Sequence, residues 1–189
     1  MAESLYGRVN AAMRAAEWSE AAFEQFFREH YGRVAAILCR LVGEQARAEE
    51  LASDIFWKLY RGRLLPPGEN AASWLYRTAT NAGIDALRAD ARRRRYERAA
   101  GEEQASGSSP ADPLGTALGK EERAQVRAAL ALLKPAQAQA LILRASGFSY
   151  KDVAETLGVK ATSVGTMLIR AETAFRACYR AVREKEEER

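Results

Sequence analysis

The sequence predicts an all-α protein made of two small helical domains joined by a flexible linker. Alanine, the best helix former, supplies 38 of the 189 residues, whereas Val, Ile and Thr together supply only 20. No segment alternates apolar and polar residues with the period of two that is typical of strands. Helices therefore account for the folded parts of the chain, and a change of composition near the middle divides them.

That change of composition lies at residues 99–119, AAGEEQASGSSPADPLGTALG. The segment holds four Gly, two Pro and three Ser, with three acidic and no basic residues. Such a segment buries too little apolar surface to order itself, so we expect a flexible acidic linker. The predicted organisation is an N-terminal extension (1–18), a first domain (19–98), the linker (99–119), a second domain (120–182) and a charged tail (183–189).

The composition argues against several classes of protein. No apolar stretch approaches the roughly 20 residues of a membrane helix, and the start of the chain lacks a secretory signal. We expect a cytoplasmic protein without membrane insertion. The only histidine, His30, is expected to be structural; Cys39 and Cys178 are isolated, which favours buried apolar groups but leaves a disulfide open. No familiar catalytic or metal motif occurs, so we predict no enzyme activity and no cofactor.

Hydrophobic periodicity predicts three helices in the first domain. The first spans residues 18–42 and the second runs from about residue 46 to 61. A proline-containing loop follows, after which Ser73 is expected to cap the third helix. The apolar stripe of the second helix consists of Leu51, Ile55 and Leu59.

The third helix carries a polar strip. At 100° per residue its members fall within an arc of about 80° on one side of the helix. Arginine neutralises phosphates, and asparagine offers both a donor and an acceptor to a base edge. The alternative is a solvated helix face whose cations lie near the helix C-terminus. The strip consists of Arg77, Asn81, Asp85, Arg88 and Arg92.

The second domain contains the spacing of a helix-turn-helix. Ser149 and Asp152 form a start like a capping box, and Thr162 or Ser163 is expected to cap the following helix. An ordinary helical hairpin is the alternative, because glycine in a turn and serine at a cap are common in hairpins. The joint spacing nevertheless favours DNA binding. Counted from Tyr150, positions five, nine and fifteen are a small residue, a turn glycine and an apolar residue: Ala154, Gly158 and Val164.

Taken together, the chain resembles the extracytoplasmic-function (ECF) group of bacterial sigma factors. In the first domain the matching stretches are AEELASDIFWKLY (48–60) and SWLYRTATNAGIDALRADARRRR (73–95). In the second they are LLKPAQAQALILRASGFSYKDVAETLGV (132–159) and the RA pair at 170–171. The order and separation of the first two stretches are the most specific part of this resemblance.

The resemblance implies a protein that binds core RNA polymerase, directs it to promoter DNA and helps to melt the −10 element. It also implies an anti-sigma factor as a further partner. By analogy, Glu49, Glu50 and Asp54 dock on the polymerase, although an exposed acidic face also aids solubility. The loop at 64–72 is then the one that captures an unstacked base.

The resemblance also implies two sets of DNA-binding residues. Within the −10 set, Asn70 has turn formation as an equal alternative, and Trp74 is better explained as a core anchor than as a stacking partner. The −10 set is Asn70, Trp74, Arg77, Asn81, Arg88 and Arg92, and the −35 set is Lys160, Thr162, Ser163, Thr166 and Arg170.

The start of the recognition helix departs from the family. Gly165 and Met167 stand where basic residues are common, and each lost phosphate contact lowers affinity. We therefore expect weak or unusual −35 binding, with more of the promoter choice made by the first domain. A rival interpretation is a polymerase-binding regulatory protein whose helix-turn-helix has lost specific DNA recognition. An enzyme is a third, for which no catalytic constellation is present.

Overall fold

The computed structural model describes residues 19–61, 70–99 and 117–187, and every regular element within these ranges is an α-helix. The predicted all-α class with two helical domains is confirmed. The predicted N-terminal extension, most of the base-capturing loop and most of the linker lie outside the described residues. The helices are α1 (Glu20–Val42), α2 (Gln45–Tyr60), α3 (Ala71–Ala99), α4 (Ala117–Leu132), α5 (Pro135–Ala145), α6 (Tyr150–Leu157) and α7 (Ala161–Glu187).

Local chemistry sets the ends of the helices in the first domain. The Ser19 hydroxyl accepts a hydrogen bond from the Ala22 N–H at 3.2 Å, and Gly43 ends α1 at a φ of 78°. The prediction that Ser73 caps α3 is wrong. The side-chain oxygen of Asn70 accepts from the Ala72 N–H at 2.9 Å, and Ser73 lies buried inside the helix. Asparagine is as good a cap as serine, so the helix starts three residues earlier.

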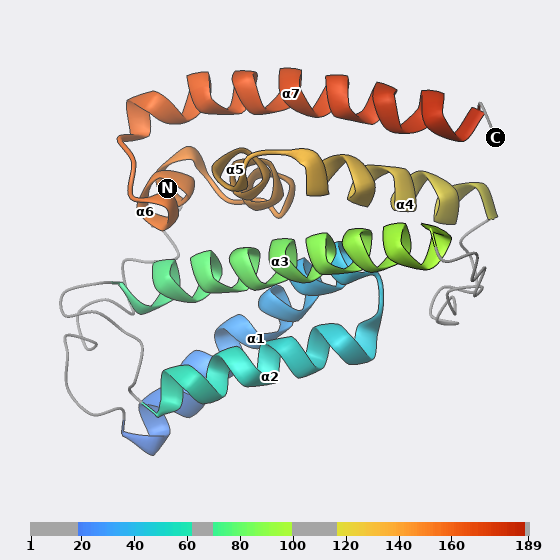
Figure 1. Ribbon diagram of the computed structural model, residues 1–189. Coiled ribbons are helices and arrows are strands. Elements are labelled where there is room, and N and C mark those ends of the chain that lie inside the picture. The colour runs from blue at the N-terminus through green and yellow to red at the C-terminus, as the bar shows by residue number, and fades with distance from the viewer. Residues whose placement is uncertain (1–18, 62–69, 100–116, 188–189) are drawn as a thin grey trace.

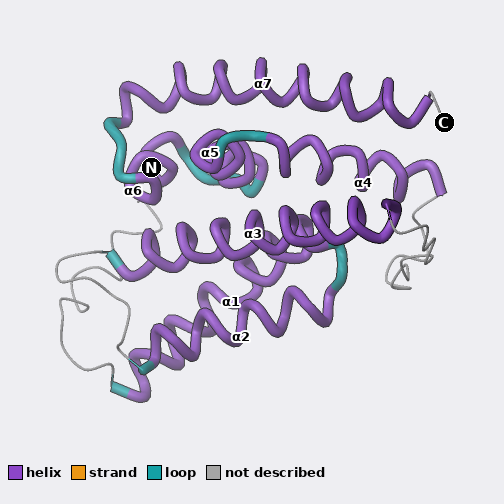
Figure 2. Tube along the Cα trace, viewed as in Figure 1, coloured by secondary structure: helices purple, strands orange, loops and turns teal. Residues whose placement is uncertain are grey.

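The helices form layers, with α3 in the middle (Figure 1). Helices α1 and α2 pack on one side of α3, and α4, α5 and α6 pack on the other. Helix α7 lies outermost and contacts α4, α5 and α6. Figure 2 shows how short the connections between α4, α5, α6 and α7 are. The long helix of the first domain is therefore the surface on which the second domain is seated.

The second domain contains the predicted helix-turn-helix. Ser149 and Asp152 form a reciprocal capping box at the start of α6, and Gly158 makes the turn with a φ of 66°. The prediction that Thr162 or Ser163 caps the next helix is wrong. Helix α7 begins at Ala161, and its first turn already includes both residues.

The apolar residues of both domains form one continuous cluster. The predicted stripe on α2 is confirmed at Ile55 and Leu59, which are buried, whereas Leu51 is half-buried. Val164 is fully buried beneath the helix-turn-helix, as its spacing predicts. Burial of this cluster supplies the main driving force for folding, at roughly 25 cal/mol per Å² of apolar surface.

The remaining expectations about special chemistry concern cysteines, metals and membranes. Cys39 and Cys178 are both free and half-buried, so they form no disulfide. The described residues include no group of three or more His, Cys, Asp or Glu side chains that is able to hold a metal ion. No described helix combines the length and the apolar character needed to cross a membrane.

We predict that Gly158→Ala and Gly165→Ala change stability in opposite directions. Alanine at the left-handed Gly158 costs about 1–2 kcal/mol of backbone energy, although no atom would contact its Cβ within 4 Å. Gly165 is helical, and its added Cβ would make an ordinary contact of 3.7 Å with Tyr150, so alanine gains up to about 1 kcal/mol. Urea unfolding of both variants measures this. Equal effects of the same sign would contradict it.

Candidate nucleic-acid interfaces

The polar strip of α3 faces the second domain. We call Arg77, Asn81, Asp85, Arg88 and Arg92 the α3 strip. Helix α3 packs against α4, α5 and α6, and this contact leaves Arg77 and Arg88 half-buried. Asn81, Asp85 and Arg92 remain exposed. Part of the surface predicted to meet DNA is therefore covered by the chain itself.

Arg88 makes the most direct of these contacts. Its Nη2 donates to the Leu133 carbonyl at 2.7 Å, and its Nε donates to the Ala131 carbonyl at 3.3 Å. Both carbonyls lie at the C-terminal end of α4, where the last carbonyls of a helix lack partners within the helix. The guanidinium of Arg88 thus completes the end of a helix in the other domain.

Arg77 and Asn81 also contact the second domain. The Nη1 of Arg77 donates to the Thr156 carbonyl at 3.4 Å, in the last turn of α6. The side-chain oxygen of Asn81 accepts a hydrogen bond from Gln139 Nε2 at 2.8 Å. Three of the six residues in the predicted −10 set therefore have partners in the second domain.

Two arginines of α1 extend the same interface. Arg33 Nη2 donates to the Ser146 carbonyl at 3.0 Å. Arg40 Nη1 lies 3.4 Å from the Ala145 carbonyl and 3.3 Å from the Ser146 hydroxyl. Ala145 is the last residue of α5 and Ser146 follows it, so these arginines meet a third helix end.

The interface thus has one recurring chemistry. Arginines of the first domain donate to the carbonyl ends of α4, α5 and α6, where the helix dipole places about half a negative charge. A cation at such an end typically contributes about 0.3–1 kcal/mol, and salt screens the contribution. The second domain therefore offers the first a set of weak anionic sites, and the arginines that occupy them are Arg33, Arg40, Arg77 and Arg88.

An aromatic contact anchors this polar interface. Phe148, only 1% exposed, meets the ring of Tyr76 edge-on with the centroids 4.6 Å apart. The Arg33 guanidinium lies 4.0 Å from the centroid of the Phe148 ring, which adds a cation–π contact. Phe148 comes from the loop between α5 and α6, so its side chain brings an apolar group of the second domain into contact with the core of the first.

Behind this anchor lies the only histidine of the chain. His30 Nδ1 is 2.8 Å from the hydroxyl of Tyr76, and both side chains are buried. Burial lowers the pKa of His30, Arg33 lowers it further, and Glu29 acts in the opposite direction. Burial raises the pKa of Tyr76 to about 12, which keeps its hydroxyl protonated. The predicted structural role of His30 agrees with this position.

The other two residues of the predicted −10 set lie at the start of α3. The side-chain oxygen of Asn70 caps the helix, accepting from the Ala72 N–H at 2.9 Å and the Ser73 N–H at 3.4 Å. Trp74 is 7% exposed and belongs to the core cluster. Both residues therefore support the helix from which the α3 strip projects.

The outer side of the helix-turn-helix is open to solvent. Its half-buried residues include Gly165 and Met167, the positions at which the sequence departs from the family. The predicted −35 residues form an exposed, mainly hydroxyl-bearing surface with one cation at each end. They are Lys160, Thr162, Ser163, Thr166 and Arg170, and all five are exposed.

A third exposed surface runs along α2. The predicted polymerase-docking residues Glu49, Glu50 and Asp54 are all exposed. Trp57 follows Asp54 at helical spacing and is 54% exposed, with its ring stacked on that of Tyr60. Trp57 and Tyr60 together expose two aromatic rings beside the acidic row, so Trp57 is a candidate contact residue that periodicity alone did not assign.

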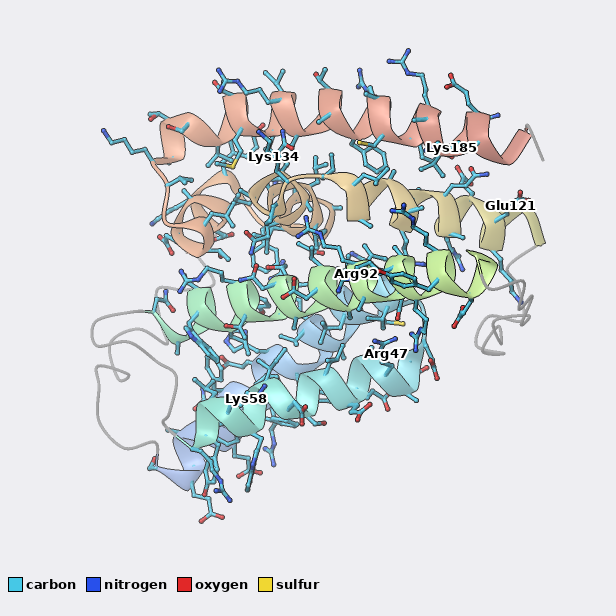
Figure 3. The ribbon with its side chains drawn as sticks, in the orientation of Figure 1. Arg47, Lys58, Arg92, Glu121, Lys134 and Lys185 are labelled. Atoms are coloured by element: carbon cyan, nitrogen blue, oxygen red, sulfur yellow. The ribbon has the colours of Figure 1, made fainter. Side chains whose placement is uncertain are left out.

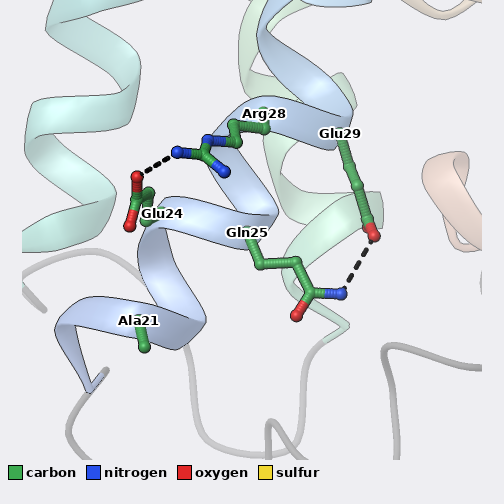
Figure 4. Close-up of a pocket in the computed structure, with 5 residues that line it drawn as sticks. All are labelled: Ala21, Glu24, Gln25, Arg28 and Glu29. Carbon is green, nitrogen blue, oxygen red and sulfur yellow. Dashed lines mark hydrogen bonds and ion pairs between the residues drawn. The ribbon is translucent and has the colours of Figure 1, made fainter.

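The described residues also line a shallow pocket at the start of α1 (Figure 4). Two hydrogen-bonded pairs span it, Arg28 with Glu24 at 2.5 Å and Gln25 with Glu29 at 3.2 Å. All of its lining residues come from one helix, and their polar side chains already form hydrogen bonds with one another. The pocket therefore lacks the convergent groups of a ligand site.

Sequence reasoning missed Arg33, Arg40, Gln139 and Phe148. Arg33 and Arg40 are seven residues apart, so they share one side of a helix. That spacing was a detectable signal, but it does not reveal which surface the side meets. Phe148 carried a weaker signal, as an aromatic residue in a glycine-containing loop.

Comparisons with known proteins agree with this geometry. Residues 26–93 match the model of Sigma-70 region 2, and residues 123–175 match that of Sigma-70 region 4. The chain is 31% identical over 158 residues to an ECF RNA polymerase sigma factor, SigE of Mycolicibacterium smegmatis, which covers 82% of this chain and 60% of that protein. It is 30% identical over 156 residues to the RNA polymerase sigma factor CarQ of Myxococcus xanthus, which covers 82% of this chain and 85% of that protein. A solved structure of CnrH in complex with the cytosolic domain of CnrY shares the fold, with a TM-score of 0.56, 22% identity, and coverage of 92% of this chain and 96% of that one.

We predict that His30 makes the folded chain less stable under mild acid. A histidine whose pKa is lower in the folded chain than in the unfolded one stabilises the fold above pH 6.5, and this stabilisation is lost as the pH falls through that value. Urea midpoints of the wild type should drop between about pH 7.5 and about pH 5.5. In His30→Gln this drop should largely disappear, because the chain has no other histidine. An unchanged drop would contradict the assignment.

Proposed function

Since this chain belongs to the ECF group of RNA polymerase sigma factors, we propose that it directs core polymerase to promoters and helps to open the −10 element. The chain spans 60% of the length of the SigE relative and 85% of that of CarQ, and both matched regions lie inside it. The observation that carries the proposal is the presence, in one chain, of an acidic docking helix, an Arg/Asn strip and an exposed helix-turn-helix. The function is one of binding rather than catalysis, and we expect it in the cytoplasm, where a bacterial polymerase works.

The test of this proposal is run-off transcription with purified bacterial core polymerase and a library of random promoters. A sigma factor yields transcripts from a defined subset of the library. The rival interpretation, a polymerase-binding protein that has lost specific DNA recognition, yields association with the polymerase but no promoter-dependent transcript. The selected promoters also supply the sequences needed for the experiments below.

Polymerase docking belongs to the acidic face of α2. Glu49, Glu50 and Asp54 present a row of negative charge to a basic partner, and Trp57 adds an apolar contact beside them. Charge complementarity of this kind raises the association rate and fixes orientation, while a buried aromatic residue supplies much of the affinity. The contribution of the acidic charges and the contribution of the Trp57 side chain can therefore be measured separately by mutation.

We predict that reversing the three acids with Glu49→Lys, Glu50→Lys and Asp54→Lys weakens core binding about tenfold or more, which corresponds to about 1.4 kcal/mol. Trp57→Ala should weaken it at any salt concentration, whereas the charge effect should fade as salt rises. Fluorescence titration with core enzyme measures both. The matched control reverses three exposed acids of the second domain, Glu121, Glu122 and Glu172. Equal loss in the control would show that net charge, not this face, matters.

Promoter recognition divides between the α3 strip and the start of α7. Arg77, Asn81 and Arg88 are proposed to hold the −10 region, with Arg92 extending the basic end of the strip. The start of α7 offers hydroxyl groups with Lys160 and Arg170 as its cations. Because phosphate contacts dominate affinity, this second surface is the weaker of the two.

We predict that scrambling the −35 box of a selected promoter reduces holoenzyme binding less than scrambling the −10 box. Introducing Gly165→Arg should add a phosphate contact and increase the dependence of binding on salt. Gly165→Ala is the control, because it changes the helix without adding charge. Gel-shift measurements at two salt concentrations provide the comparison. A −35 effect as large as the −10 effect would contradict the proposal.

The resemblance also makes an anti-sigma factor the expected regulator. The solved CnrH structure holds the cytosolic domain of CnrY, and we propose a partner of the same functional class here. Such a partner would act on a chain whose two domains already touch.

A further inference from the structure

We propose that Ile169 recognises the methyl group of thymine in the −35 element and so determines part of the promoter specificity. This inference rests on the proposed binding of that element by the helix-turn-helix, and it names a base that the site selects. The residues that the sequence indicates for this surface offer hydrogen bonds and charge, and Ile169 is not among them. Its side chain is 66% exposed. Because single exposed apolar residues are common, its position on the helix carries the inference.

Ile169 lies on the side of α7 that faces away from the other helices. Val164, Leu168 and Ala171 are buried, and they mark the side of α7 that packs on the second domain. Side chains along the outer side of α7 project away from the rest of the chain (Figure 3). At 100° per residue, four exposed residues fall opposite the buried side, within an arc of about 60°. We call them the α7 face: Thr162, Thr166, Ile169 and Thr173.

The α7 face is more apolar than its hydroxyl groups suggest. Thr166 precedes Ile169 by three residues and Thr173 follows it by four, so both are its neighbours on the helix surface. The Thr173 hydroxyl donates to the Ile169 carbonyl at 2.9 Å, so this hydroxyl bonds the backbone of its own helix and does not donate to a base. Each threonine also carries a methyl group, and Ile169 extends this apolar character along the face.

Thymine is the base whose chemistry fits such a face. Its C5-methyl group lies in the major groove, where it makes apolar contacts with side chains such as the methyl group of threonine. An isoleucine side chain has neither a donor nor an acceptor, so it cannot read the hydrogen-bonding groups of a base pair. The thymine methyl group is therefore the feature of a base-pair edge that offers Ile169 the largest apolar contact.

The charges around the α7 face favour DNA as its occupant. Lys160 and Arg170 are exposed beside the face. Glu172 is the only acidic residue between positions 160 and 173, and it lies about 100° from the centre of the face. Basic residues of this kind hold the phosphates and orient the helix, whereas contacts with base edges supply specificity. A duplex held by the two cations thus meets the apolar side chain of Ile169.

Replacement of thymine by deoxyuridine tests the proposal, because it removes one methyl group and keeps every hydrogen-bonding group of the base pair. Each thymine in the −35 box of a promoter selected by the holoenzyme is replaced in turn, and gel shifts give the affinity of the holoenzyme for each duplex. We expect at least one replacement to weaken binding about fourfold, the factor that corresponds to burial of one methyl group. This factor should be equal at two salt concentrations, because the contact involves no charge.

Variants of Ile169 assign the effect to its side chain. In Ile169→Ala, thymine and deoxyuridine should bind equally at the sensitive position, whereas Ile169→Val keeps a branched apolar side chain and should keep part of the difference. The matched control is Leu132→Ala, which removes a side chain that is 63% exposed at the end of α4. This control should keep the full factor. Because Ile169 is exposed, its substitution should leave urea unfolding almost unchanged.

The outcomes separate this inference from the proposed function. If scrambling the −35 box weakens binding but the box holds no thymine, or tolerates deoxyuridine at every position, recognition of the methyl group is overturned and the role of the helix-turn-helix stands. A deoxyuridine effect that persists in Ile169→Ala also overturns the inference, because it then comes from DNA shape or from another residue. If scrambling the box has no effect, the proposed role of the helix-turn-helix fails together with this inference.

Discussion

The contact between arginine side chains and the carbonyl ends of helices determines how the two halves of this chain are arranged. Arg88 completes the end of α4 with hydrogen bonds of 2.7 and 3.3 Å, and Arg33 does the same for the end of α5 at 3.0 Å. Each helix end carries only a partial charge, so each contact is weak by itself. Because both domains belong to one chain, however, their association is intramolecular and several weak contacts suffice. The result is an interface that combines several weak polar contacts with the buried apolar contact of Phe148 and Tyr76.

The sequence predicted the parts of the fold that depend on local patterns. The spacing of Ile55 and Leu59 identified the buried side of α2, and that of Ala154, Gly158 and Val164 identified the helix-turn-helix. These predictions succeeded because helical periodicity and turn chemistry act within a few residues. The errors at Ser73, Thr162 and Ser163 are of two or three residues, since neighbouring residues compete for the same cap.

The packing of the second domain against α3 could not be predicted from such local patterns. Periodicity assigns Arg77, Asn81 and Arg88 to one side of a helix, but a side that is polar enough to bind DNA is also polar enough to bind carbonyls. The same ambiguity hid Arg33, which lies beside the buried Val34 on a largely apolar helix. Contacts between residues that are far apart in the sequence decide which surface covers a polar strip. These contacts exist only in the folded chain, so a local sequence pattern does not reveal them.

The difference between a helix end and a phosphate determines which partner prevails. A helix end offers about half an elementary charge, whereas each phosphate of DNA carries a full one. In the proposed function, a phosphate is therefore the stronger acceptor for each arginine of the α3 strip, whereas the contact of Phe148 with Tyr76 favours the packed domains. Under the proposed docking through α2, a polymerase that presents the promoter beside the α3 strip raises the local concentration of phosphate there.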